Sequence, residues 1–337
     1  MWRISFFGSL IICTIILATC SSCGSDPDSP NPPNPNPPTA PTPPKIPAFN
    51  ADSAYNYIAK QVDFGPRVIG SEGHGACKDW LVETFRALGA RVQQQEFTAD
   101  LYTGESFRGT NIIAQINPDV SDRLLLCAHW DTRHVADSPL STERQEEPIL
   151  GADDGGSGVG VLLEVARLLQ ESPVGIGIDI VLFDAEDYGE QNGDPETYCL
   201  GSQYWSRNRP TPYKPRYGIL LDMVGAKGAQ FPVEGYSAYY APAVVQKVWG
   251  MAKRMGRTNY FVNRQMQGGI TDDHFFVNTI AQIPTVDIIN LNGTDQTAFG
   301  AHWHTHNDNM DIIDKNTLRT VGQVLLAVIY NEDAGLL

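Results

Sequence analysis

Apolar residues follow two alternating spacings along residues 48–337. Apolar side chains three or four positions apart run from Ala76 to Leu88, and Gly89 ends this pattern, which predicts an amphipathic helix. The same spacing predicts helices at 158–169, 243–255 and 318–328. Three short, mostly apolar runs, typical of buried strands, occupy 124–127, 178–183 and 218–221, and 285–289 is the candidate for a fourth. Strands that alternate with helices predict a single α/β domain with a central, mostly parallel mixed sheet flanked by helices.

Acidic residues and a histidine stand where these predicted strands end. His129 and Asp131 follow the first strand, Glu186 and Asp187 follow the second, and Asp222 follows the third. In open α/β sheets, ligands bind outside the carboxyl ends of the strands. We therefore expect these side chains to converge on one crevice.

The first residues of the chain have the layout of a secretory signal peptide. Arg3 precedes an apolar run at 4–18, and Cys20 and Cys23 follow it. Either cysteine resembles the lipidated first residue of a bacterial lipoprotein, so residues 1–22 are interpreted as a signal peptide with a lipobox. Cleavage by the ordinary signal peptidase is the alternative. The interpretation predicts an exported protein, periplasmic or held at the outer membrane of a Gram-negative bacterium by a lipid anchor.

Residues 23–47 are rich in proline, with Asn, Ser, Thr and Asp between the prolines. This composition favours extended polyproline II and offers nothing to bury, so the segment is interpreted as a spacer. The boundaries leave 48–337 as one folded domain.

Charge and cysteine content narrow the classes of partner. The formal net charge is −15, which argues against nucleic acid or an anionic membrane surface as partner. A membrane contact is thus expected only through the lipid anchor. The cysteines of the folded domain are Cys77, Cys127 and Cys199, so a disulfide scaffold is not expected. We expect a monomer.

Five short segments carry the candidate chemistry: 128–132, 151–158, 184–189, 221–223 and 303–306. Zinc takes nitrogen and carboxylate oxygen ligands, usually four, and a catalytic site keeps one position open. Three protein ligands therefore suffice. In the adjacent pair Glu186–Asp187, one carboxylate can bind metal while the other moves protons.

Each segment alone has a simpler interpretation. A His-x-Asp after a strand is often a structural hydrogen-bonded pair, and an adjacent Glu-Asp pair is often solvated loop charge. The glycine-rich segment 151–158 fits a turn into a helix, or a weak imitation of a phosphate loop that its acidic residues argue against. Their combination on successive strand ends favours a metalloenzyme.

Together these segments resemble the zinc aminopeptidase (M28) superfamily, which carries the Gly-Ala-Asp-Asp turn seen here at 151–154. The resemblance extends over roughly residues 50–335. Further matches are similar to the animal-type glutaminyl cyclases and their bacterial branch. They lie at 64–67, 221–225, 231–232, 270–274 and 299–305.

This resemblance implies a zinc aminopeptidase-like α/β sandwich at 48–337 that holds one Zn²⁺ per chain. The positions that match the zinc ligands are Asp154, Asp187 and His304. Asp187 stands where the animal enzymes have a glutamate. They also have a tryptophan shortly after this acidic pair, whereas this chain has none before Trp205.

The resemblance also implies roles for the remaining matched positions. Glu186 matches the general acid/base, and Asp222 and Asp272 match two carboxylates that hydrogen-bond with it. The positions that match substrate-binding residues and pocket walls are Ile270, Thr271, Phe299 and Trp303.

The implied activity converts the N-terminal glutamine of peptides and proteins to pyroglutamate, with release of ammonia. The alternative is an M28-type zinc aminopeptidase, in which His129, Asp154 and Asp222 hold a second zinc. A binding module with a relic site would need a missing ligand, and none is missing. For the cyclase we expect His129 nearby but unligated, and Asp131 orienting the strand end by hydrogen bonds.

Overall fold

The computed structural model describes residues 43–337. The predicted signal peptide, the two candidate lipidation sites and most of the predicted spacer lie outside the described residues. None of the helices within the described part is both long enough and apolar enough to cross a membrane.

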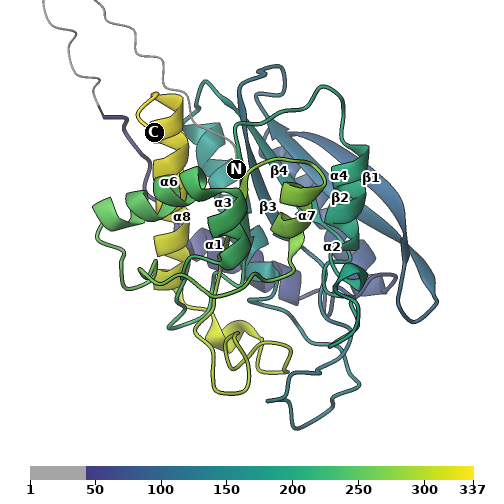
Figure 1. The fold of residues 1–337 in the computed structure, drawn as a ribbon. Helices are drawn as coiled ribbons and strands as arrows, with labels where there is room; N and C mark the ends of the chain where they lie inside the picture. Colours follow the sequence, from purple (N-terminus) through teal and green to yellow (C-terminus); the bar gives the residue numbers. More distant parts are fainter. Residues whose placement is uncertain (1–42) are drawn as a thin grey trace, which may run out of the picture. The chain divides into compact units, whose positions relative to one another are not determined.

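A six-stranded mixed sheet forms the centre of the domain, in the order β1-β2-β4-β3-β5-β6 (Figure 1). The strands are β1 (Arg91–Asp100), β2 (Ser106–Ile116), β3 (Arg123–His129), β4 (Gly177–Phe183), β5 (Gly218–Asp222) and β6 (Thr285–Ile289). β3 pairs in parallel with both β4 and β5, and β5 pairs in parallel with β6. β2 is antiparallel to both β1 and β4. The prediction of a mostly parallel mixed sheet is confirmed.

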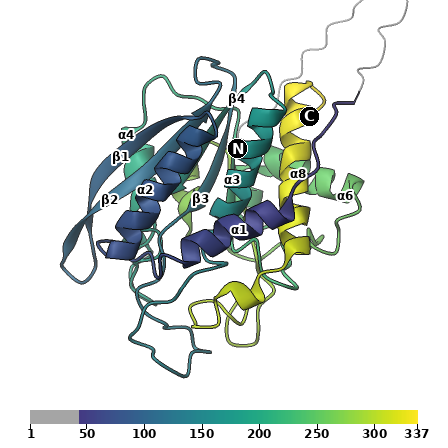
Figure 2. The same ribbon diagram turned by 180° about the vertical axis from the view of Figure 1, so that it is seen from behind.

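Helices cover both faces of this sheet. They are α1 (Ala51–Val62), α2 (Glu72–Ala87), α3 (Gly156–Glu171), α4 (Leu200–Asn208), α5 (Gly235–Tyr240), α6 (Pro242–Arg254), α7 (Asp273–Thr279) and α8 (Lys315–Asp333). Figure 2 shows α1, α2, α3 and α8 on one face, and Figure 1 shows α4 and α7 on the other. Short 3-10 turns, η1 (Pro195–Thr197) and η2 (Met310–Ile312), complete the fold.

The continuous apolar runs in the sequence follow from this layering. In β3, Leu124 and Leu126 pack under the helices α1, α3 and α8, whereas Leu125 and Cys127 face α4 and α7. Because successive side chains of a strand point to opposite faces, a strand covered on both faces is mostly apolar along its length. β3, β4, β5 and β6 are accordingly buried along their whole length.

The start of α3 lies against the ends of two strands. A side chain at Gly158 would meet the backbone oxygen of Leu221 in β5 at 2.3 Å, and one at Gly155 would meet the ring of His129 at 2.4 Å. Glycine at these positions lets the turn before α3 approach the carboxyl ends of β3 and β5. This approach places Asp153 and Asp154 beside the strand ends.

Candidate active site

Asp154, Asp187 and His304 come together at the carboxyl edge of the sheet. One potential ligand atom from each lies within 4.8 Å of the other two. Nε2 of His304 is 3.0 Å from Oδ1 of Asp187 and 3.7 Å from Oδ2 of Asp154. All three are buried, and Oδ2 of Asp187 has no hydrogen-bond partner. Two carboxylates and one imidazole nitrogen that converge in this way fit a catalytic zinc site.

Asp137 fixes the orientation of His304. Its Oδ1 lies 3.0 Å from Nδ1 of His304, which leaves Nε2 free to face the two carboxylates. Arg133 pairs with Asp137 and also donates hydrogen bonds to the backbone oxygens of Asp187 (2.9 Å) and Gly189 (2.8 Å). Burial alone would raise the pKa of Asp137, but hydrogen bonds from His304 and Arg133 hold it below its ordinary value. A carboxylate behind a ligating histidine is a common second layer of metal sites.

Two further aspartates hold the backbone of the ligand turns. Asp131 accepts hydrogen bonds from the N–H groups of Glu186 and Asp187, both at 3.1 Å. The expectation that Asp131 orients the strand end is confirmed. Asp308 accepts the N–H groups of Asp153 (2.7 Å) and Asp154 (3.1 Å) in the same way.

Glu186 lies beside the metal-ligand cluster, with its side chain 12% exposed. Its Oε1 is 3.2 Å from Sγ of Cys199, and its Oε2 is 3.9 Å from Nδ1 of His129. Burial raises the pKa of Glu186 well above its ordinary value; His129 lowers it, and the carboxylate of Asp187 raises it further. A buried carboxyl group of this kind can carry a proton near neutral pH.

The hydrogen bonds predicted between Glu186 and the two other carboxylates differ from those observed. Among the described residues, no hydrogen bond joins Glu186 to Asp222 or Asp272. Asp222 instead lies 3.2 Å from Nε2 of His129, and Asp272 accepts the N–H of Asp273 at the start of α7. Because carboxylates repel one another, Asp222 and Asp272 each face a hydrogen-bond donor instead of Glu186.

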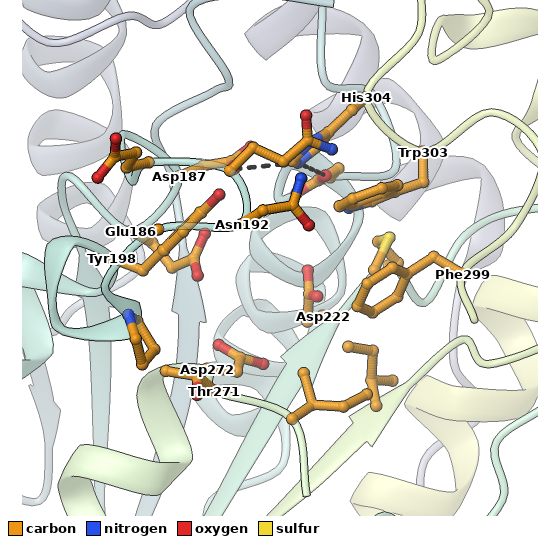
Figure 3. Close-up of a pocket in the computed structure, with 18 residues that line it drawn as sticks. Glu186, Asp187, Asn192, Tyr198, Asp222, Thr271, Asp272, Phe299, Trp303 and His304 are labelled. Carbon is orange, nitrogen blue, oxygen red and sulfur yellow. Dashed lines mark ion pairs between the residues drawn. The ribbon is translucent and has the colours of Figure 1, made fainter. Parts of the chain in front are cut away.

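One cavity of about 320 Å³ joins these groups. All ten predicted site residues line it: Asp154, Glu186, Asp187, Asp222, Ile270, Thr271, Asp272, Phe299, Trp303 and His304. Figure 3 shows the carboxylates on one side of this space and the two aromatic rings on the other. The rings of Phe299 and Trp303 are 4.6 Å apart, and Trp303 stacks on His304 at 3.8 Å.

Part of the cavity wall is formed by polar side chains. Gln191, Asn192 and Tyr198, from the segment after the acidic pair, line the cavity here. Figure 3 shows Asn192 between Glu186 and Trp303. The segment therefore contributes two amide groups and a phenol to the cavity wall.

His129 forms a second group of possible metal ligands, with Asp154 and Asp222. Its Nε2 lies 3.0 Å from Oδ1 of Asp154 and 3.2 Å from Oδ1 of Asp222. His129 is 1% exposed and is not among the residues that line the cavity. The structure thus places it nearby, behind the predicted zinc site.

Three of the supporting residues were not predicted from the sequence. Arg133, Asp137 and Asp308 lie in irregular segments far along the chain from the groups they hold. Asp137 follows the strand-end histidine and aspartate by only a few residues, but no motif marks it. In the sequence, Cys199, which contacts Glu186, stands out only as one of the cysteines of the folded domain.

Comparison with known proteins shows which family this chain resembles. The profile of peptidase family M28 matches residues 111–329. Glutaminyl-peptide cyclotransferase from Drosophila melanogaster is 24% identical over 285 residues, which span 77% of this chain and 75% of that protein. The crystal structure of Porphyromonas gingivalis glutaminyl cyclase is 50% identical, with a TM-score of 0.82 over 85% of this chain and 99% of that one.

A third relative carries the name of the alternative activity. The structure of a Zn-dependent exopeptidase from Parabacteroides distasonis is 47% identical, with a TM-score of 0.82 over 85% of this chain and all of that one. The family profile covers more than half of the chain, and the chain is 50% identical to a glutaminyl cyclase structure that it covers almost completely. The chain therefore belongs to peptidase family M28 and, within it, to the glutaminyl cyclases.

Proposed function

We propose that this chain converts N-terminal glutamine of peptides and proteins to pyroglutamate at a single zinc site. The observation that carries the proposal is the shared cavity. Within about 320 Å³ it combines the ligand cluster, the carboxyl group of Glu186 with its raised pKa, and two aromatic walls. This space suits one terminal residue and leaves the rest of the peptide outside.

The residues that would hold the zinc are Asp154, Asp187 and His304. Their donor atoms converge, one carboxylate oxygen is unpaired, and the histidine is oriented by Asp137. A zinc ion bound there would polarise the γ-carbonyl of the substrate and stabilise negative charge on its oxygen.

Glu186 is the proton carrier in this scheme. The substrate's α-amino nitrogen forms a bond to its own γ-carbonyl carbon, and Glu186 accepts the proton that this nitrogen loses. Glu186 then gives a proton to the side-chain amide nitrogen, whose bond to carbon breaks as ammonia leaves. Both transfers fit a carboxyl group with a raised pKa.

Other cavity residues hold the substrate in a reactive conformation. Asp222 lines the cavity and would bind the substrate's α-amino group through its carboxylate. A carboxylate oxygen of Asp272 lies within 4.8 Å of one of Glu186. Phe299 and Trp303 restrict the glutamine side chain, and Ile270 and Thr271 also line the cavity. Because nucleophile and electrophile belong to one residue, restraint of its conformation lowers the barrier.

One assay tests this function against hydrolysis of N-terminal residues. Purified zinc-loaded protein is given two peptides that differ only in their first residue, Gln or Leu. We expect ammonia and a pyroglutamyl peptide from the Gln peptide, and no free amino acid from either. Release of free leucine at a comparable rate would favour the aminopeptidase.

We also propose that the protein is exported and acts as a lipid-anchored monomer. The lipobox-like cysteines and the proline-rich spacer support the anchor. In a Gram-negative host, replacing both Cys20 and Cys23 by Ser should move the full-length protein from the membrane to the soluble fraction. If Cys23→Ser alone has this effect, Cys23 is the lipidated residue. Unchanged membrane association of the double variant would contradict the anchor.

A further inference from the structure

Cys199 contacts the proposed proton carrier through both its side chain and its backbone. Its Sγ lies 3.2 Å from Oε1 of Glu186, and its N–H donates to the backbone oxygen of Glu186 at 2.8 Å. The next N–H, of Leu200, donates to the backbone oxygen of Ala185 at 3.0 Å. The start of α4 therefore holds the turn that carries Glu186 from two sides.

The thiol is the hydrogen-bond donor to this carboxyl group. Among the described residues, no other side chain is hydrogen-bonded to the Glu186 carboxyl, since Nδ1 of His129 is 3.9 Å away. Asp272 is also near: one carboxylate oxygen of Glu186, Sγ of Cys199 and one carboxylate oxygen of Asp272 lie within 4.8 Å of one another. The thiol is thus close to two carboxyl groups that do not hydrogen-bond to each other.

Packing alone does not account for a cysteine at this position. Cys199 is fully buried and has no disulfide partner. Its backbone φ is +57°, a conformation that residues other than Gly, Asn and Asp seldom adopt. Burial and nearby carboxylates raise the pKa of its thiol well above the ordinary value, so the thiol keeps its proton and remains a donor.

We propose that Cys199 is a positioning residue for the cyclisation, one that holds the Glu186 carboxyl group in a single orientation through both proton transfers. A thiol is a weak donor, so it can orient a carboxylate without strongly favouring the ionised form. The inference rests on the proposed function, because it concerns the proton carrier of that reaction.

The test compares kcat and KM of zinc-loaded wild type, Cys199→Ala and Cys199→Ser on a Gln peptide. Loss of one hydrogen bond of this kind should lower kcat of the alanine variant roughly 3- to 10-fold and change KM less than about twofold. Serine retains a donor and should restore most of kcat. Zinc content and melting temperature are measured for every variant.

Cys127→Ala is the matched control, because Cys127 is also a buried free thiol but packs among apolar residues in β3. It should lower the melting temperature and leave kcat near the wild-type value. If Cys199→Ala does not fold, Cys199→Gly replaces it, since glycine accepts the positive φ without strain.

Two outcomes would overturn the inference. One is an unchanged kcat in the variant that lacks the thiol. The other is an equal loss of kcat and melting temperature in the Ala and Ser variants, which would assign Cys199 to packing. A wild-type protein that fails to cyclise Gln peptides would instead contradict the proposed function itself.

Discussion

Two groups of possible metal ligands share Asp154 and have the same composition, one histidine and two aspartates. All of the group with Asp187 and His304 lines the cavity, whereas in the group with Asp222 the histidine, His129, does not. Both groups bring their donor atoms within 4.8 Å. Residue type and spacing therefore do not distinguish them.

The surroundings of the two histidines distinguish the two groups. Nδ1 of His304 is held by Asp137 at 3.0 Å, so its Nε2 is aimed at the ligand carboxylates. Nδ1 of His129 has no hydrogen-bond partner; the nearest carboxylate, Asp131, is 3.5 Å away and already accepts two backbone N–H groups. Ligating histidines nearly always donate their second nitrogen to a partner. The difference favours one zinc, on the cavity side.

Removing a ligand of the cavity group should have the largest effect. Asp187→Ala leaves two protein ligands, so we expect loss of the zinc and of all measurable cyclisation. Metal analysis after dialysis checks the first result. Asp187→Glu is the control, because it keeps a carboxylate and should retain about one zinc per chain. Retention of the zinc by Asp187→Ala would remove Asp187 from the ligand set.

Glu186→Gln should separate proton transfer from metal binding. The variant keeps the shape of the side chain, so the fold and zinc content should match the wild type. Activity should fall by ~100-fold or more, since general acid/base catalysis typically contributes that much. Loss of zinc from Glu186→Gln, with retention in Asp187→Ala, would reverse the roles of the adjacent carboxylates.

Asp137→Asn tests the support behind His304 and should have a smaller effect. Loss of such a carboxylate typically weakens metal affinity about 10- to 100-fold. Competition with a chelator measures the zinc affinity. Asp295→Asn, an exposed position, is the control and should leave the affinity unchanged. Equal affinities in the two variants would show that Asp137 does not contribute to metal binding.

The sequence predicted those parts of the fold in which apolar residues follow directly from burial. The strands β3 to β6 are buried on both faces and appear as apolar runs. β1 is an edge strand with mostly exposed polar residues, and its hairpin partner β2 was also missed. α2 begins at Glu72, before the predicted start, because Ser71 accepts the N–H of His74.

The candidate site shows the same division. Residues at strand ends were found because the topology of the sheet brings them together. Arg133, Asp137 and Asp308 were missed because they act on groups far away in the sequence through tertiary contacts. The partners of Asp222 and Asp272 also depended on which donors the folded chain brings near them.

His129→Asn should have the smallest effect on metal content, and it decides between the two groups. Asparagine retains a donor for Asp154 and Asp222 but removes the imidazole, so a zinc held on the cavity side should remain. We expect about one zinc per chain in both wild type and variant, even after incubation with excess zinc. In a two-metal aminopeptidase, the count would be about two in the wild type and would fall to about one in the variant. That result, together with release of free leucine from a Leu peptide by the wild type, would favour the aminopeptidase. The group with His129 would then hold the second metal, which activates water.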